Sequence, residues 1–202
     1  MILTDCGVEF NEKEHSYLLN GNELSGITGI ISTRLFPQKY INVPESTLQK
    51  AAERGNNIHY QCALSDDLPI ESEYEEVINY KALIDKNELN VECSEYLVTD
   101  YKRIASAIDK VFRVSEDEFI LGDIKTTYRL DKKFLMWQLS IYAWLFELVN
   151  SGAKVKQLLG IWLKNEKARL VEIERLPTEK VKALIDFHFD NFENEDLFLT
   201  DI

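Results

Sequence analysis

Residues 104–125, IASAIDKVFRVSEDEFILGDIK, decide the fold of this chain. They contain two runs rich in strand-forming residues, Ile104–Phe112 and Phe119–Lys125, separated by a short polar break. Two such runs in succession predict a β-hairpin. Each run holds one carboxylate among its apolar residues, Asp109 in the first and Asp123 in the second. The hairpin therefore brings two acidic side chains to the same region of a sheet.

A lysine joins these carboxylates. Side chains two apart in a strand share a face, so Asp123 and Lys125 are expected to point the same way. Clustered carboxylates raise one another's pKa unless a divalent cation lies between them. Such a cation activates water for phosphodiester hydrolysis, and a lysine neutralises charge in the transition state. We predict catalytic roles for Asp109, Asp123 and Lys125; the alternative is that this D-x-K triplet is an ordinary strand surface.

The remaining chain alternates between predicted helices and strands. Apolar residues at spacings of three and four predict helices, and short β-branched or aromatic runs predict strands. A short apolar segment at 27–35 has no assigned structure. The predicted elements are an N-terminal hairpin from Val8–Phe10 and His15–Leu19 with a turn signal at Asn20-Gly21, helices over Glu45–Leu64, Glu73–Asn87, Leu130–Val149 and Thr178–Phe192, and strands over Val91–Tyr101, Arg103–Val114, Glu118–Thr126, Val155–Lys164 and Ala168–Ile173, with a turn near Asn165-Glu166.

This order predicts an α/β (α+β) fold in which helices flank a mixed β-sheet. The length of 202 residues suits one domain, 1–202. Within it we expect a hairpin and irregular extension at 1–44, a core at 45–175 and a C-terminal helix in 176–202. The order alone fits many unrelated folds.

The composition limits the class of protein. No apolar run approaches the ~20 residues of a membrane span, and the N-terminus lacks a secretory signal, so we expect a cytoplasmic protein without a membrane partner. The three cysteines, Cys6, Cys62 and Cys93, are scattered and form no C-x-x-C pair. They predict free thiols and exclude a disulfide scaffold, a zinc knuckle and an iron–sulfur cluster.

The net charge of −12 is unusual for a protein that binds nucleic acid. Its distribution is uneven: residues 99–170 carry 13 Lys and Arg against 9 Asp and Glu, and the remainder carries 10 against 26. The acidic part is either a solvated surface or a docking surface for a basic partner. Candidates for phosphate contacts in the basic part are Lys102, Arg103, Lys110, Arg113, Arg129, Lys132 and Lys133.

Further residues extend the candidate site in both directions. Gly55 and His59 form a G-x-x-x-H pattern on a predicted helix, and Glu95 lies in the first predicted strand of the core. Gln138 and Tyr142 are four apart on the long helix and therefore share a face. Gly55 costs roughly 1 kcal/mol in a helix interior, which close approach of the helix to the sheet or to DNA would explain.

The ordered series resembles the RecB-like, phage-exonuclease branch of the PD-(D/E)XK nuclease superfamily over roughly residues 45–165. The resemblance implies a restriction-endonuclease-like core of order α-β-β-β-α-β. It also implies that His59, Asp109 and Asp123 bind metal and that Lys125 is catalytic. The chain departs from several relatives in lacking four cysteines for an iron–sulfur cluster. The supporting or DNA-binding residues are then Glu95, Gln138, Tyr142, Gly55 and Arg129, and the carbonyl of Ile124 is a further candidate metal ligand.

The function implied is a Mg²⁺- or Mn²⁺-dependent deoxyribonuclease, a hydrolase in which an exonuclease is favoured over an endonuclease. Linear DNA ends are the favoured substrate, RNA is not excluded, and the setting by analogy is phage or mobile-element recombination and repair. A helicase or recombination protein is a candidate partner. The alternative is a catalytically weak or inactive nuclease-fold binding module that acts through a protein partner, as the acidic surplus suggests.

Overall fold

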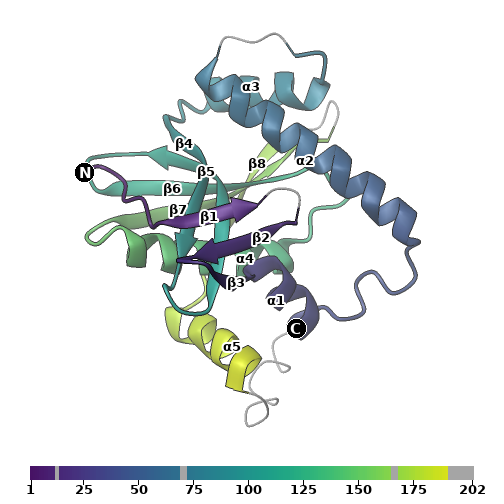
Figure 1. The fold of residues 1–202 in the computed structure, drawn as a ribbon. Coiled ribbons are helices and arrows are strands. Elements are labelled where there is room, and N and C mark those ends of the chain that lie inside the picture. Colours follow the sequence, from purple (N-terminus) through teal and green to yellow (C-terminus); the bar gives the residue numbers. More distant parts are fainter. Residues whose placement is uncertain (12–13, 69–71, 165–167, 191–202) are drawn as a thin grey trace.

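The computed structural model describes residues 1–11, 14–68, 72–164 and 168–190. Figure 1 shows the elements in this part of the chain. In chain order they are β1 (Val8–Asn11), β2 (Ser16–Leu19), β3 (Asn22–Gly26), α1 (Ile27–Leu35), α2 (Glu45–Asp67), α3 (Glu75–Lys86), β4 (Val91–Thr99), β5 (Ile104–Arg113), β6 (Glu118–Lys125), α4 (Lys132–Val149), β7 (Lys154–Trp162), β8 (Arg169–Ile173) and α5 (Thr178–Asp190).

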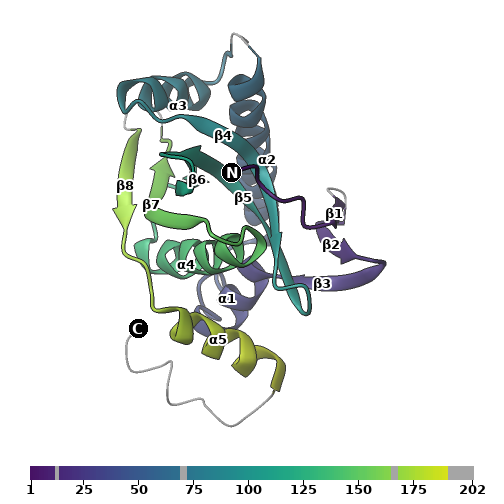
Figure 2. The same cartoon turned by 90° about the vertical axis from the view of Figure 1, so that its left-hand side faces the viewer.

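The strands form one mixed sheet with helices on both sides. Within the described residues the sheet has eight strands in the order β1-β2-β3-β5-β6-β7-β8, and β4 pairs with β5 beside this path. Figures 1 and 2 show α2 and α3 on one side of the central strands and α4, α1 and α5 on the other. The predicted α/β class with a mixed sheet flanked by helices is confirmed.

The two edges of β5 have different partners, and this creates a fork in the sheet. One edge pairs with β4 along almost the whole strand. The other edge pairs with β3 at Ile104 and Ala105 and with β6 from Lys110 to Arg113. Between these two pairings, no strand of the described chain pairs with this edge of β5. Asp109 lies at this open part of the strand.

α4 joins β6 to the parallel strand β7 and covers the sheet. β6 and β7 pair along their full lengths, which requires a crossover connection of this kind. The helix begins after Asp131, whose side chain accepts a hydrogen bond from the N–H of Phe134 at 3.0 Å. Most residues of α4 are buried, because it packs against the sheet on one side and α1 and α5 on another. The crossover fixes β6, and with it Asp123 and Lys125, beside the fork.

A buried ion pair attaches α2 to the sheet. The Nζ of Lys110 lies 2.5 Å from the Oδ2 of Asp66 and 2.8 Å from the Oγ of Ser94, and Lys110 is 0% exposed. Tyr80 of α3 donates a hydrogen bond to the same Asp66 carboxylate at 2.9 Å. The prediction that Lys110 contacts phosphate is therefore wrong. These contacts of Lys110 and Asp66 link α2, α3, β4 and β5.

The N-terminal region differs from its prediction in two ways. The Asn20-Gly21 turn joins β2 to a third strand, β3, which the sequence did not predict. The apolar segment after it is the helix α1. The predicted turn near Asn165-Glu166 and the end of the last helix at Phe192 lie outside the described residues.

Two predictions from composition can be compared with the structure. The three cysteines are free thiols, with Cys6 and Cys62 buried and Cys93 half-buried, as predicted. Across residues 1–11, 14–68, 72–164 and 168–190, no helix combines the length and apolar character needed to cross a lipid bilayer.

Close packing at Gly122 yields a test of the fold. A Cβ at this position would lie 2.9 Å from both Ile161 Cδ1 and Phe112 Cε2, and these two side chains are buried. We predict that Gly122→Ala lowers the free energy of unfolding by about 1–3 kcal/mol, the usual cost of overpacking a core. Urea unfolding measures this change.

The matched control is Gly29→Ala in α1, where an added Cβ meets nothing within 4 Å. It should raise the free energy of unfolding by roughly 0.5–1 kcal/mol, since alanine is favoured over glycine within a helix. A Gly122→Ala protein as stable as the wild type would contradict the packing described here.

Candidate active site

Five of the predicted site residues converge on one cavity of about 690 Å³ at the fork of β5. His59 comes from α2, Glu95 from β4, Asp109 from β5, and Asp123 and Lys125 from β6. All five side chains line the cavity. Four separate elements therefore supply these five acidic or basic side chains to a single site.

The side chain of Asp109 binds a backbone group of β6 at the fork, where β5 and β6 are no longer paired. Its Oδ2 accepts a hydrogen bond from the backbone N–H of Ile124 at 2.6 Å and lies 3.4 Å from Nδ1 of His59. Burial alone would raise the pKa of Asp109, but the charge of His59 and its hydrogen bond lower it. Burial would likewise lower the pKa of His59, but the negative charge of Asp109 raises it. The two side chains thus stabilise each other's charged forms.

Asp123 is a buried carboxylate that lacks hydrogen bonds. It is 1% exposed, and neither of its carboxylate oxygens has a hydrogen-bond partner among the described residues. The Nζ of Lys125 lies 2.5 Å from its Oδ2, so this contact is an ion pair without hydrogen-bond geometry. Burial raises the pKa of Asp123 to about 6. The site therefore holds an acidic group whose charge the protein alone compensates poorly.

Lys125 remains protonated at neutral pH. Burial would lower the pKa of Lys125, but the negative charges of Asp123 and Asp109 raise it above its usual value. The expected same-face arrangement of Asp123 and Lys125 is present, because their side chains are in contact. A lysine that keeps its proton acts as a hydrogen-bond donor and a positive charge, and it does not act as a general base.

Glu95 adopts an unusual backbone conformation. Its φ angle is +51°, which costs a non-glycine residue roughly 1–2 kcal/mol. It lies between the register pairs Ser94–Lys110 and Tyr96–Ile108, and therefore faces Asp109. Its side chain is exposed at the cavity, where desolvation and the charge of Asp109 raise the pKa of Glu95 to about 7. The strained backbone accompanies a carboxylate held beside a second carboxylate.

Three of these side chains form a group that could hold a metal ion. His59, Glu95 and Asp109 each offer one ligand atom, and these atoms lie within 4.8 Å of one another. The sequence prediction shares His59 and Asp109 with this group, but treats Glu95 as a supporting residue and Asp123 as a ligand. Carboxylate oxygens suit Mg²⁺ and Mn²⁺, an imidazole suits transition metals, and no cysteine is among the described residues that line the cavity.

Gln138 and Tyr142 lie side by side on α4 and line the same cavity. The Nε2 of Gln138 donates a hydrogen bond to the Tyr142 hydroxyl at 2.9 Å, as their spacing of four predicts. Both side chains are buried, and the Oε1 of Gln138 has no hydrogen-bond partner among the described residues. A buried acceptor in a cavity requires a donor from water or from a ligand.

The other predicted supporting residues lie nearby but contribute less. A Cβ at Gly55 would meet only Thr126 Oγ1, at 3.8 Å, so close approach of α2 to the sheet does not explain this glycine. Arg129 is exposed between β6 and α4. The N–H of Ile124 binds Asp109, and a ligand role for its carbonyl remains a prediction.

Two further arginines predicted to contact phosphate form ion pairs within the protein. Arg103 lies 2.7 Å from Asp186, and Arg113 lies 2.5 Å from Glu92. Both pairs are partly exposed, where such contacts contribute little to stability. Even so, their charges are already compensated. The excess of Lys and Arg over Asp and Glu in residues 99–170 therefore does not provide unpaired positive charges at Arg103 and Arg113.

The sequence did not predict the part of the cavity that comes from the N-terminal hairpin. Phe10, His15 and Tyr17 line the cavity, as does Tyr60, which follows His59 on α2. No motif links the hairpin to the core, because the two meet through contacts between distant segments, such as the pairing of β3 with β5. Among these residues, only Tyr60 had a local signal for a place in the site, because it follows His59 in the sequence.

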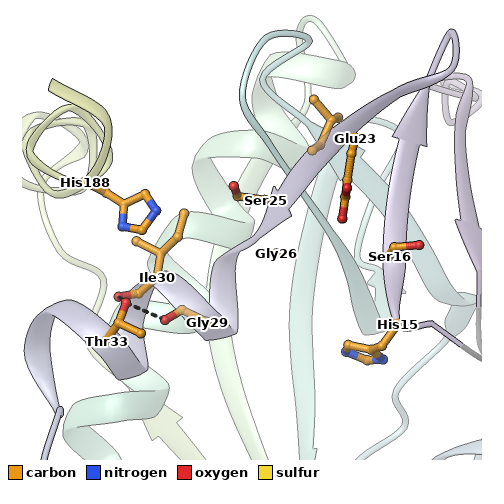
Figure 3. Close-up of a pocket in the computed structure, with 10 residues that line it drawn as sticks. His15, Ser16, Glu23, Ser25, Gly26, Gly29, Ile30, Thr33 and His188 are labelled. Carbon is orange, nitrogen blue, oxygen red and sulfur yellow. Dashed lines mark hydrogen bonds between the residues drawn. The ribbon is translucent and has the colours of Figure 1, made fainter.

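A second, smaller cavity of about 490 Å³ lies next to the first, and His15 lines both. Figure 3 shows its lining residues, which come from the β2–β3 hairpin, α1 and His188 of α5. The Thr33 hydroxyl is already bonded to the carbonyl of Gly29 at 2.8 Å. Glu23 is the single carboxylate among its described lining residues, so it lacks the clustered acids of the larger cavity.

The burial of Asp123 predicts a pH dependence of stability. Its pKa of about 6 in the folded protein lies above the unfolded value of about 4. The folded protein therefore binds the Asp123 proton more tightly than the unfolded chain does, and this stabilises the fold at low pH. In wild-type protein without metal, this part of the free energy of unfolding is lost as the pH rises from about 4 through about 6. We predict that Asp123→Asn, which cannot ionise, gains stability relative to the wild type across that interval. Urea unfolding in EDTA from about pH 4 to pH 7 measures it, and parallel curves would contradict the shifted pKa.

Comparison with known proteins gives little further guidance. No family model matches this sequence, and no curated protein matches it. The solved structures that resemble it include the crystal structure of SSO0001. That chain is 17% identical, the alignment covers 88% of this chain and 80% of that one, and the TM-score is 0.44. A similarity of this degree supports neither a family nor a function.

Proposed function

We propose that this chain is a divalent-metal-dependent nuclease that hydrolyses DNA phosphodiester bonds. The observation that carries the proposal is the convergence of Asp109, Asp123 and Lys125 in one cavity, with both oxygens of the buried Asp123 lacking hydrogen bonds. A buried carboxylate that lacks hydrogen bonds is costly to a fold, and the retention of Asp123 beside a lysine favours a site that binds a cation and a phosphate.

The topology is compatible with the resemblance to the PD-(D/E)XK nucleases. A helix, three antiparallel strands β4, β5 and β6, the helix α4 and the parallel strand β7 follow one another along the chain. This is the α-β-β-β-α-β order of a restriction-endonuclease-like core. We therefore propose that core, and with it an exonuclease acting on linear ends in phage or mobile-element recombination, by family analogy.

The residues present fit a divalent cation. His59, Glu95 and Asp109 would hold it, and Asp123 offers carboxylate oxygens without hydrogen bonds in the same cavity. When bound there, Mg²⁺ or Mn²⁺ supplies a Lewis acid for the phosphoryl oxygen and a bound water of lowered pKa. The same donor set gives no support for an iron–sulfur cluster.

Lys125 and Gln138 have distinct roles in the proposed reaction. The protonated Lys125 places positive charge where the phosphoryl group gains negative charge, and Asp123 holds its ammonium in position. The Oε1 of Gln138 has no hydrogen-bond partner among the described residues, so it is available as an acceptor for a group that enters the cavity. Tyr142 fixes the Gln138 amide through its hydroxyl.

Cleavage of DNA tests the proposal directly. We predict digestion of linear DNA with Mg²⁺ or Mn²⁺, none in EDTA, and a fall in kcat of about 10²–10³-fold in Lys125→Ala, the usual effect of removing one transition-state donor. Lys154→Ala is the matched control, because that exposed lysine forms only a surface ion pair with Asp117. Full activity of Lys125→Ala, or activity in EDTA, would contradict the mechanism.

Metal binding separates the nuclease from the alternative of an inactive binding module. We predict saturable binding of Mn²⁺ in calorimetric titration, weakened at least tenfold in Glu95→Gln because one of the clustered ligands is lost. Glu9→Gln, at an exposed carboxylate on β1, is the control and should bind as the wild type does. The absence of saturable binding by folded wild-type protein would favour the module.

A further inference from the structure

The cavity extends beyond the carboxylates to a group of aromatic side chains. Phe10 and Tyr17 come from the N-terminal hairpin, and their rings stack with centroids 4.8 Å apart and an interplanar angle of 30°. Tyr60 comes from α2, one residue after His59. These three rings line the same cavity as Asp109. A flat apolar surface therefore lies in the same cavity as the candidate metal site.

Tyr60 leaves most of its ring uncovered. Its exposed fraction is 60%, although it lies in the cavity between residues of the site. Tyr17, in contrast, is 5% exposed and forms part of the core. An aromatic ring exposed in a cavity offers a face on which a second flat group can stack.

The cavity also holds an acceptor that lacks a donor. Gln138 is 5% exposed, and its Oε1 has no hydrogen-bond partner among the residues the structure describes. Nucleobases combine a flat aromatic face with N–H donors on their Watson–Crick edge, an exocyclic amino group or a ring N–H. A nucleobase in this cavity would therefore satisfy both features, the exposed ring of Tyr60 and the unpartnered oxygen of Gln138.

The size of the cavity limits the form of the ligand. Its volume of about 690 Å³ lies within the ~300–1,000 Å³ that is typical of sites for small molecules. A base within a duplex is stacked and paired, and it must leave the stack to enter such a pocket. The cavity therefore has the size for a single unpaired nucleotide.

The charge of the protein points the same way. The chain has a net charge of −12, and Lys110, Arg103 and Arg113 are engaged in internal ion pairs. Affinity for duplex DNA comes largely from phosphate contacts by lysine and arginine. Base stacking does not need these charges and tolerates any sequence. A stacking site thus supplies affinity that does not depend on contacts with phosphates.

We infer that the cavity binds an unpaired nucleobase of single-stranded DNA, stacked on Tyr60 in the cavity that Phe10 and Tyr17 also line, with its adjoining phosphate beside Lys125. This inference rests on the proposed function and names its substrate class. The protein prefers single strands and frayed ends to closed duplex, with little preference for sequence.

Binding of labelled oligonucleotides tests the inference. Fluorescence anisotropy with Ca²⁺ compares one 12-nucleotide single strand with the same sequence as a duplex, for wild type, Tyr60→Ala, Tyr60→Phe and Tyr74→Ala. The single strand should bind more tightly, and Tyr60→Ala should weaken it about 5- to 100-fold, the loss typical of one stacked base. Tyr60→Phe should retain binding, as should the control Tyr74→Ala, which alters an exposed tyrosine outside the cavity.

The outcomes separate this inference from the proposed hydrolysis. Equal affinity for duplex and single strand, or wild-type binding by Tyr60→Ala, overturns the inference even when DNA is cleaved with metal. Binding of single strands that depends on Tyr60, without cleavage in any divalent metal, supports the nucleobase site and rejects the nuclease. Loss of binding in Tyr74→Ala as well would show that the effect is not specific to the cavity and would overturn the inference.

Discussion

The candidate site depends on the way in which β5 divides one edge between two strands. β3 pairs with the start of β5 and β6 pairs with its end, while β4 occupies the opposite edge. Between these pairings the sheet opens, and the cavity forms there. Asp109 fills part of the opening by binding the N–H of Ile124. The separation of strands thus makes room for a ligand within the sheet.

A sheet opened in this way must be held from outside, and two arrangements do so. The crossover through α4 keeps β6 parallel to β7, with Gly122 allowing close packing behind Asp123. The buried contact of Lys110 with Asp66 holds α2 against β5, so that His59 reaches Asp109. Removing one partner of a buried ion pair is strongly destabilising. The ion pair between Lys110 and Asp66 therefore supports the charged site, although neither residue lines the cavity.

The hairpin at 104–125 was predictable from its two strand-forming runs. The strand period also places Asp123 and Lys125 on one face, and the structure has them in contact. Other features depend on tertiary structure. Lys110 resembles a surface residue in the sequence, yet Asp66 and Ser94 enclose it. The positive φ of Glu95 has no signal in the sequence, and the approach of Phe10 and Tyr17 to the site arises from pairing between distant segments. Local patterns therefore predicted the acidic core of the site but not its aromatic wall.

The central claim is that the fork of β5 holds a divalent cation beside Asp123 and Lys125. Anomalous diffraction from crystals soaked in Mn²⁺ tests it most directly, because it locates the metal without relying on activity. The account predicts a peak within roughly 2.0–2.6 Å of oxygens of Glu95 and Asp109, with His59 or Asp123 completing the coordination. Ordered side chains at the fork with no anomalous peak, or a peak only at other positions, would contradict it.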